Sequence, residues 1–283
     1  MSDKRAAKTK STVSLVFVNF FLFLFSLTCV FPFIWMFYSS FKTQREFGRS
    51  IISLPSSLDF TNFTSVFEAK DNNLIQAMIN SLRVTVLSLF FIVLFGFILG
   101  YILGRIRFRG NRVVYLILML GMLIPVHALM APVYILFSGA GLTNNLNGLT
   151  IPYIAFGLPI PVFLVESYVK GIPVSLEEAA AIDGSGFTRS MFSIILPICR
   201  PVLATAAIIQ AFYCWNEFLF ARILLQGNLQ TVTVALANMR GQHTANFPKI
   251  FATMLISMIP VIIFYFSFSK QIIKGMVAGA TKG

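Results

Sequence analysis

The most conspicuous shortage in this sequence is charge. Only 11% of the 283 residues are Asp, Glu, Lys or Arg, against about a quarter in an ordinary soluble domain. Hydrophobic residues make up 57%, and phenylalanine alone occurs 31 times. So few charges cannot cover so much apolar surface in water. The composition therefore excludes an ordinary soluble domain and indicates a protein embedded in lipid.

Acidic residues are especially few, with ten Asp and Glu against 22 Lys and Arg, which leaves a net charge of +12. A nucleic-acid-binding domain would gather its basic residues on one face of an otherwise polar surface. Here the basic residues stand in short groups between long apolar runs, a distribution that sets the orientation of membrane proteins. We therefore expect membrane lipid, and no nucleic acid, as a partner of this chain.

Residues for catalysis, metal binding and ATP binding are also lacking. The three cysteines show no CxxC spacing, and neither histidine has a second ligand at metal-binding spacing. The glycine-containing stretch 184–190 lacks the lysine and the spacing of a phosphate-binding loop. No nucleophile stands beside a base. The sequence thus predicts a non-enzymatic chain with no metal and no cofactor, whose energy must come from another polypeptide.

Apolar runs of roughly 20 residues, enough to cross a bilayer, recur along the chain. The first is too long for the core of a cleaved signal peptide. The uncharged stretch 113–165 is too long for one helix, and turn-forming residues interrupt it at 138–148. We therefore predict an all-α membrane protein with six transmembrane helices, at about 13–39, 84–104, 113–137, 149–165, 201–221 and 250–269.

These spans predict the organisation of the chain and its orientation. The segments are a basic tail (1–12), a first transmembrane helix (13–40), an external loop (41–73), a five-helix domain (74–269) with a long loop at 166–200, and a C-terminal tail (270–283). Of the basic residues, 14 fall on the side of the two termini and eight on the other side. Because cytoplasmic loops are enriched in Lys and Arg, both termini are predicted to lie in the cytoplasm.

The loop 166–200 contains a short helical pattern. Pro173 and Ser175 favour a helix start, and Ser175 with Glu178 matches a capping box. The three alanines that follow favour helix, and Gly184 suits the position just after a helix end. A helix of barely two turns needs a partner to pack against. By their spacing, Leu176, Ala179, Ala180 and Asp183 would share one face of this helix, and most of them have small side chains. By itself, the pattern also fits a surface turn that closes the loop.

The wider spacing resembles the EAA motif of ABC importer permeases. Glu178-Ala-Ala is followed by Asp183-Gly184 and, after nine intervening residues, by Ile194-x-Leu196-Pro197. In that family this loop is the coupling helix, which seats in a groove of the ATPase subunit. The resemblance implies an ATPase-coupling role for Glu178, Ala179, Ala180, Asp183, Gly184, Leu196 and Pro197.

Other stretches are similar to the carbohydrate-uptake branch of this family, of the maltose-importer type. Trp215-Asn-Glu-Phe218 and the closing Gly279-Ala-Thr-Lys-Gly283 are the most specific of them. The likeness extends from about residue 74 to the C-terminus and implies a type I ABC importer permease fold in the cytoplasmic membrane of a prokaryote. The implied partners are a second permease subunit, a dimer of ATP-binding subunits, an extracytoplasmic solute-binding protein and a sugar as substrate.

Glu217 is the only carboxylate predicted well inside a span, and Asn216 precedes it. A charge at the bilayer centre costs roughly 3 kcal/mol, so this side chain must face a cavity, a partner or water. One interpretation places Asn216 and Glu217 on the translocation path. The other places Glu217 at the membrane boundary, which Trp215 would mark.

The sequence leaves one rival function from another class, a self-contained secondary transporter or channel in which the loop 166–200 is only a connector. Such proteins usually contain several titratable groups within the membrane, or internal repeats. A single carboxylate and no evident repeat argue against this alternative.

Overall fold

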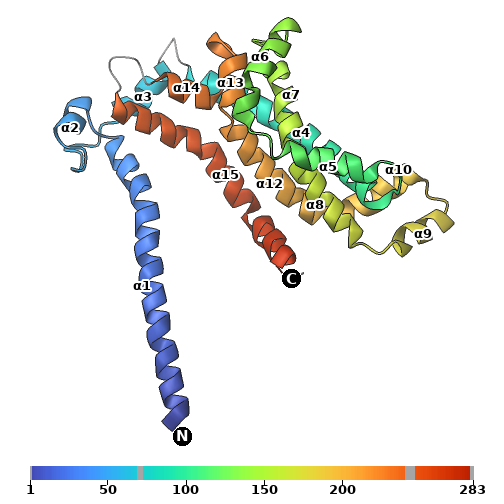
Figure 1. Cartoon of the computed structure of the whole chain (residues 1–283). Coiled ribbons are helices and arrows are strands. Elements are labelled where there is room, and N and C mark those ends of the chain that lie inside the picture. Colours follow the sequence, from blue (N-terminus) through green and yellow to red (C-terminus); the bar gives the residue numbers. More distant parts are fainter. Residues whose placement is uncertain (1, 69–72, 240–245, 281–283) are drawn as a thin grey trace. The chain divides into compact units, whose positions relative to one another are not determined.

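The computed structural model describes residues 2–68, 73–239 and 246–280, and helices are the only regular secondary structure in these ranges (Figure 1). The chain divides into two compact units. Unit 1 comprises residues 1–69 and 239–256, and unit 2 comprises residues 70–238 and 257–283. The prediction of an all-α chain is confirmed for the described residues.

Unit 1 consists of a long helix followed by short helices and turns that fold back onto its end. Its helices are α1 (Ser2–Ser39), α2 (Gln44–Arg49), α3 (Thr61–Glu68) and the first turns of α15 (Phe247–Ala280). The indole Nε1 of Trp35 donates to the carbonyl of Ile51 at 3.0 Å, and the hydroxyl of Tyr38 donates to that of Ile52 at 2.8 Å. The segment after α2 is therefore bonded back onto the end of α1, so this part of the predicted external loop has a defined structure.

Unit 2 is built around α4 (Leu74–Arg105), which packs against α7 (Leu146–Gly157), α8 (Pro159–Lys170) and α12 (Arg200–Asn216). Its other helices are α5 (Asn111–Gly121), η1 (Val126–Leu129), α6 (Met130–Gly139), α9 (Ser175–Ile182), α10 (Phe187–Arg189), the π turn η2 (Ser190–Ile195), α11 (Leu196–Ile198), α13 (Leu219–Leu224), η3 (Gly227–Leu229), α14 (Val232–Asn238) and the remainder of α15. Two apolar clusters fill it, one around Leu149 and Phe220 and one around Val165 and Ile195.

Three glycines four residues apart bring α4 close to α8. A Cβ atom on Gly96 would lie 2.5 Å from Cβ of Pro161, and one on Gly100 would lie 2.7 Å from Cβ of Val165. Gly104 continues the same face one turn further on. Small residues at this spacing let helix backbones approach in a membrane, where burial of apolar surface no longer drives helices together. The spacing is visible in the sequence and could have predicted this pair of helices.

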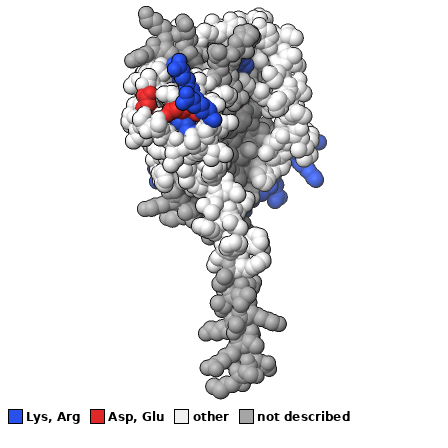
Figure 2. Space-filling model, turned by 90° about the vertical axis from the view of Figure 1, so that its left-hand side faces the viewer, with Lys and Arg blue, Asp and Glu red and all other residues white. Residues whose placement is uncertain are grey.

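The apolar helices are of two kinds. Three are long enough to cross a membrane unbroken, at Phe17–Ser39, Leu74–Arg105 and Phe247–Phe268. Three more are bent pairs, with bends of 94°, 44° and 76°: Asn111–Gly121 with Val126–Gly139, Leu146–Gly157 with Pro159–Lys170, and Phe187–Ile198 with Arg200–Asn216. The described residues thus contain three spans, or up to six if each bent pair is one span. On the face drawn in Figure 2, most of the described residues are uncharged, and the charged side chains gather mainly in one cluster near its top.

The predicted spans at 113–137, 149–165 and 201–221 each contain a break. The first breaks between Gly121 and Val126, and the second breaks at Leu158. A proline lies at each of these two breaks, Pro125 or Pro159, and has no N–H to donate to a helical carbonyl. The third ends at Asn216, where Glu217 takes an extended conformation.

Candidate functional site

The loop between α8 and α12 is mostly helical and lies at one end of unit 2 (Figure 1). α8 continues to Lys170, so the connection is shorter than the predicted 166–200. α9 runs from Ser175 to Ile182 and is the two-turn helix that the sequence predicted. The run α10–η2–α11 then leads from Phe187 to Ile198.

The predicted capping box at the start of α9 is wrong. The residue that precedes the helix is Val174, in the right-handed helical region, and no side chain caps the helix. The carbonyl of Val174 already accepts from the N–H groups of Glu177 and Glu178. Ser175 therefore lies inside the first turn, where its hydroxyl is not placed to bond the N–H groups of that turn.

The predicted end of α9 is confirmed. Gly184 has φ +80°, the left-handed conformation that glycine adopts without strain. Its N–H donates to the carbonyl of Ala181 at 3.0 Å, and the N–H of Ser185 donates to that of Ala180 at 2.8 Å. These two bonds form a Schellman motif, which satisfies the last carbonyls of the helix and turns the chain sharply.

The structure divides the predicted coupling residues into two groups. Four are exposed on or just after α9, namely Glu178, Ala179, Asp183 and Gly184. Ala180 is buried, whereas Leu176 is 43% exposed, so the predicted common face is only partly available. Leu196 and Pro197 belong to the other helical run and are half-buried, with Leu196 against the core cluster around Ile195. The exposed residues of α9 are thus available to a partner, whereas Leu196 and Pro197 are only half-buried parts of the following helical run.

Sequence reasoning missed Glu177, which the structure joins to α4. Its carboxylate forms an ion pair with Nε of Arg105 and accepts a hydrogen bond from the hydroxyl of Tyr101. The Nη2 atom of Arg105 also donates to the carbonyl of Ile172 at 2.9 Å. These contacts join residues 67 to 76 positions apart in sequence, and no local pattern connects them.

Glu217 bridges a break between two helices. It follows the last residue of α12, and its carboxylate oxygens accept from the N–H groups of Phe220 at 2.8 Å and Ala221 at 3.2 Å. Its charge is therefore stabilised by the start of α13, where unpaired N–H groups and the helix dipole favour an anion. Asn216 is exposed, and its side-chain amide donates back to the carbonyl of Phe212 in α12.

Glu217 is not the only carboxylate within an apolar helical segment. Glu166 lies in α8, is buried, and pairs with Lys170 one turn later. The sequence placed Glu166 in a loop because the uncharged run ends at Val165. A pair of opposite charges at this spacing lets the helix continue, because each neutralises the other.

Replacement of Glu217 by alanine is expected to destabilise the purified protein by about 0.5–2 kcal/mol, the range for loss of a helix cap. Asn216→Ala is the matched control, because its amide bonds only within its own helix. Thermal unfolding in detergent should show a lower transition temperature for Glu217→Ala alone. An equal decrease in both variants would contradict the capping role.

Several buried polar atoms lie near this break. Among the described residues, no hydrogen-bond partner is found for the buried side-chain oxygens of Thr85, Ser88, Tyr153, Gln210 and Tyr213. These residues belong to α4, α7 and α12. The ring centroids of Tyr153 and Tyr213 are 6.4 Å apart. Unpaired polar groups are costly inside a membrane protein. Each of these oxygens marks a buried position where ordered water or a polar solute could supply the missing hydrogen bond.

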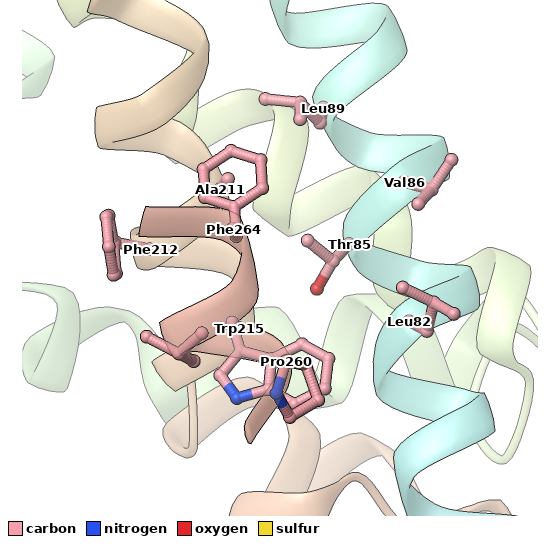
Figure 3. A pocket seen from close by; sticks show the side chains of 10 residues that line it. Leu82, Thr85, Val86, Leu89, Ala211, Phe212, Trp215, Pro260 and Phe264 are labelled. Carbon is pink, nitrogen blue, oxygen red and sulfur yellow. The ribbon is translucent and has the colours of Figure 1, made fainter. Parts of the chain in front are cut away.

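A neighbouring pocket is of a different character (Figure 3). It is lined by residues of α4, α12 and the unit 2 part of α15, including the rings of Phe212, Trp215 and Phe264. Figure 3 shows the side chain of Thr85 as its one hydroxyl-bearing group. A sugar needs several donors and acceptors at fixed positions to be held specifically. This pocket alone is therefore not suited to bind one.

Comparison with known proteins shows what this chain resembles. Residues 96–277 match the family described as "Binding-protein-dependent transport system inner membrane component". The chain is 33% identical over 258 residues to the probable starch degradation products transport system permease protein AmyC of Thermoanaerobacterium thermosulfurigenes, with 91% of this chain and 93% of the relative covered. It is 31% identical over 281 residues to the melibiose/raffinose/stachyose import permease protein MelC of Bacillus subtilis, with 99% and 100% covered.

A solved structure has the same fold. This is a crystal structure of a bacterial ABC transporter involved in the import of the acidic polysaccharide alginate. It aligns with a TM-score of 0.78 at 25% identity and covers 90% of this chain and 95% of the matched chain.

Proposed function

The chain belongs to the family of binding-protein-dependent transport system inner membrane components, and from this premise we propose that it is one of two permease subunits of an importer that carries a sugar across the cytoplasmic membrane. The substrate is a mono- or oligosaccharide or a related polyol or glycoside. Relatives named for starch products and for melibiose, raffinose and stachyose support this substrate class. ATP is hydrolysed by a separate subunit, because the sequence has no phosphate-binding loop.

The observation that carries the proposal is α9, an exposed two-turn helix with a sharp Schellman stop. Its apolar side chains Leu176 and Ile182 are 43% and 87% exposed. A helix this short does not hold its shape in water by itself. The exposed side chains of α9 therefore favour contact with a partner protein. We assign the ATPase contact to Glu178, Ala179, Asp183 and Gly184, with Ala180, Leu196 and Pro197 supporting them.

The membrane arrangement that we propose has six spans, with both termini in the cytoplasm. Each bent pair then serves as one span, which places the α9 loop on the same side as the termini. The excess of basic residues on that side supports this orientation. Broken helices are tolerated in transporters where a cavity or a neighbouring helix satisfies the freed backbone groups.

A second permease subunit is supported by α1. Between Phe17 and Ile34 the side chains of α1 described in unit 1 are exposed. Phenylalanine side chains on several sides of this helix, including Phe17, Phe25 and Phe33, are more than half exposed. We infer that α1 packs against the partner permease, and that the two subunits together form a heterodimer around the path.

We place the translocation path beside Asn216 and Glu217, at the break between α12 and α13. The exposed amide of Asn216 and the unpaired oxygens of Tyr153 and Gln210 would supply donors and acceptors to a passing sugar. The helix break supports this position, because broken helices commonly form the solute sites of transporters.

The first test is affinity purification of the tagged chain from mild detergent, with identification of co-purified proteins by mass spectrometry. We expect a second permease, an ATP-binding subunit and a solute-binding protein, whose sugar can be found by thermal shift against a panel. The assembled complex should transport that sugar only with ATP. A homo-oligomer that transports without ATP would establish the secondary-transporter alternative instead.

Glu178→Lys is expected to release the ATP-binding subunit while the second permease remains bound. The substitution reverses an exposed charge and leaves the body of unit 2 unchanged. Normal recovery of the ATP-binding subunit with this variant would remove Glu178 from the docking surface.

A further inference from the structure

Two adjacent glutamates of α9 have opposite surroundings. Glu178 is exposed, whereas the side chain of Glu177 is 15% exposed and pairs with Arg105, which is 11% exposed. Consecutive residues of a helix point about 100° apart, so one can face the body of the protein while the other faces outward. Three hydrogen-bonded contacts converge here, from Arg105 to Glu177 and to the carbonyl of Ile172, and from Tyr101 to Glu177. We call this group the clasp.

The clasp is the main polar attachment of α9 to the rest of unit 2. Ala180 is the only buried residue of the helix. The hydrophobic residues at its two ends, Leu176 and Ile182, are exposed. In the part of the chain that the structure describes, α9 forms no other salt bridge. Arg105 and Tyr101 therefore tie α9 to α4, in addition to the packing of α9 against η2.

α4 is anchored at its other end as well. The amide of Asn80 donates to the carbonyls of Asn228 at 2.8 Å and Gln230 at 3.0 Å, and Oγ of Ser81 accepts from the N–H of Val232 at 2.8 Å. From Asn80 to Arg105 the helix is about 38 Å long. α9 and α14 accordingly lie at opposite ends of unit 2 (Figure 1). One unbroken helix thus joins the α9 loop to the segment 228–232.

We propose that Arg105 is a positioning residue for energy coupling: with Tyr101 it fastens α9 to α4, so that a displacement of α9 by the ATPase moves α4 and the segment 228–232 at its far end. This inference rests on the proposed function. It adds that Glu177 transmits the displacement within the permease, whereas Glu178 receives it from the ATPase. An ion pair withdrawn from water suits this task, because either partner left alone would be a buried, uncompensated charge.

The test uses the complete importer in liposomes, with the permease pair, the ATPase and the binding protein. Arg105→Gln should keep the ATPase bound and lower the sugar-plus-binding-protein stimulation of ATP hydrolysis by about tenfold, within the usual range of coupling between sites. The charge exchange Arg105→Glu with Glu177→Arg should recover part of this loss. Arg109→Gln is the matched control, since Arg109 is exposed and has no ion-pair partner among the described residues.

Each result decides the matter. Normal stimulation in Arg105→Gln, or no recovery in the charge exchange while the ATPase stays bound, overturns the clasp. If Arg105→Gln does not accumulate, Arg105→Gln with Glu177→Gln leaves no buried charge unpaired and should show the same loss of stimulation. Normal stimulation in that double variant would overturn the clasp too. Failure of the wild-type chain to retain any ATPase would instead contradict the proposed function.

Discussion

Replacement of Gly184 by proline is expected to abolish sugar uptake while the chain still inserts into the membrane. Proline fixes φ near −65°, whereas Gly184 has φ +80°. The substitution also removes the N–H that donates to the carbonyl of Ala181. The Schellman motif cannot form, so the chain leaves α9 in another direction and the exposed residues at its end are displaced. Apart from the residues next to it in the chain, no described residue has an atom within 4 Å of a Cβ added here, so the effect is one of backbone conformation.

Gly186→Pro is the matched control, two residues away. Gly186 has φ −76° and an extended ψ, which proline adopts readily. Uptake of the labelled sugar, together with the amount of chain in the membrane, should be near normal for Gly186→Pro and absent for Gly184→Pro at equal abundance. Equal uptake by the two variants would show that the turn after α9 has no part in coupling. Release of the ATP-binding subunit by Gly184→Pro would identify docking as the lost step.

The second large effect is expected from Gly100→Leu, on folding. A Cβ atom at this position would lie 2.7 Å from Cβ of Val165, 2.8 Å from its Cγ1 and 3.0 Å from the carbonyl of Val162. Overpacking of a well-packed interior typically costs about 1–3 kcal/mol, and here the obstacle includes backbone. α4 and α8 must separate, which disturbs the core cluster around Val165. We therefore expect most of this variant to be aggregated or degraded.

Gly121→Leu provides the comparison, because a Cβ at Gly121 meets nothing within 4 Å. Size-exclusion chromatography in detergent should show a monodisperse peak for Gly121→Leu and a strongly reduced one for Gly100→Leu. Gly100→Ala should fall between them, since its Cβ already meets Val165. Similar folded yields for the two leucine variants would mean that α4 and α8 can move apart without loss.

In unit 2, Arg105 connects the glycine face of α4 with the loop that contains α9. It lies one residue beyond the glycine face of α4, and its guanidinium reaches both Glu177 and the carbonyl of Ile172. The close packing of α4 on α8 and the clasp thus fix the two ends of the chain segment that leads from α8 into α9. Gly100 and Arg105 variants should nevertheless differ, because the first changes the amount of folded protein and the second changes coupling in protein that has folded.

Much of this protein could be predicted without a structure, for identifiable reasons. The scarcity of charge predicted that the chain is embedded in lipid, because apolar surface of this extent cannot be exposed to water. The two-turn helix ending at Gly184 followed from local preferences, since alanine favours helix and glycine accepts a positive φ. The loop that we propose for coupling was identified from residues whose spacing is itself part of the EAA motif that it resembles. These features depend on composition or on neighbours a few residues away.

One expectation failed for a local reason. The capping box at Ser175 did not form, because the helix begins one residue earlier with the carbonyl of Val174 as its acceptor. The structure also shows that Glu217 caps the helix that follows it, a contact that depends on the helix break at Asn216. The helix pairs around Pro125 and Pro159 are bent by 94° and 44°, and the prolines alone do not fix the size of these bends.

The sequence by itself determined that this chain is a helical membrane protein and where the short helix ending before Gly184 lies, because both are read from composition and from short-range spacing. Only the tertiary structure decided which glutamate of α9 faces inward, since Arg105 is 72 residues from Glu177 and meets it through the packing of α4 on α8. Two neighbouring glutamates have the same local preferences. The contact that separates their roles is made by the fold.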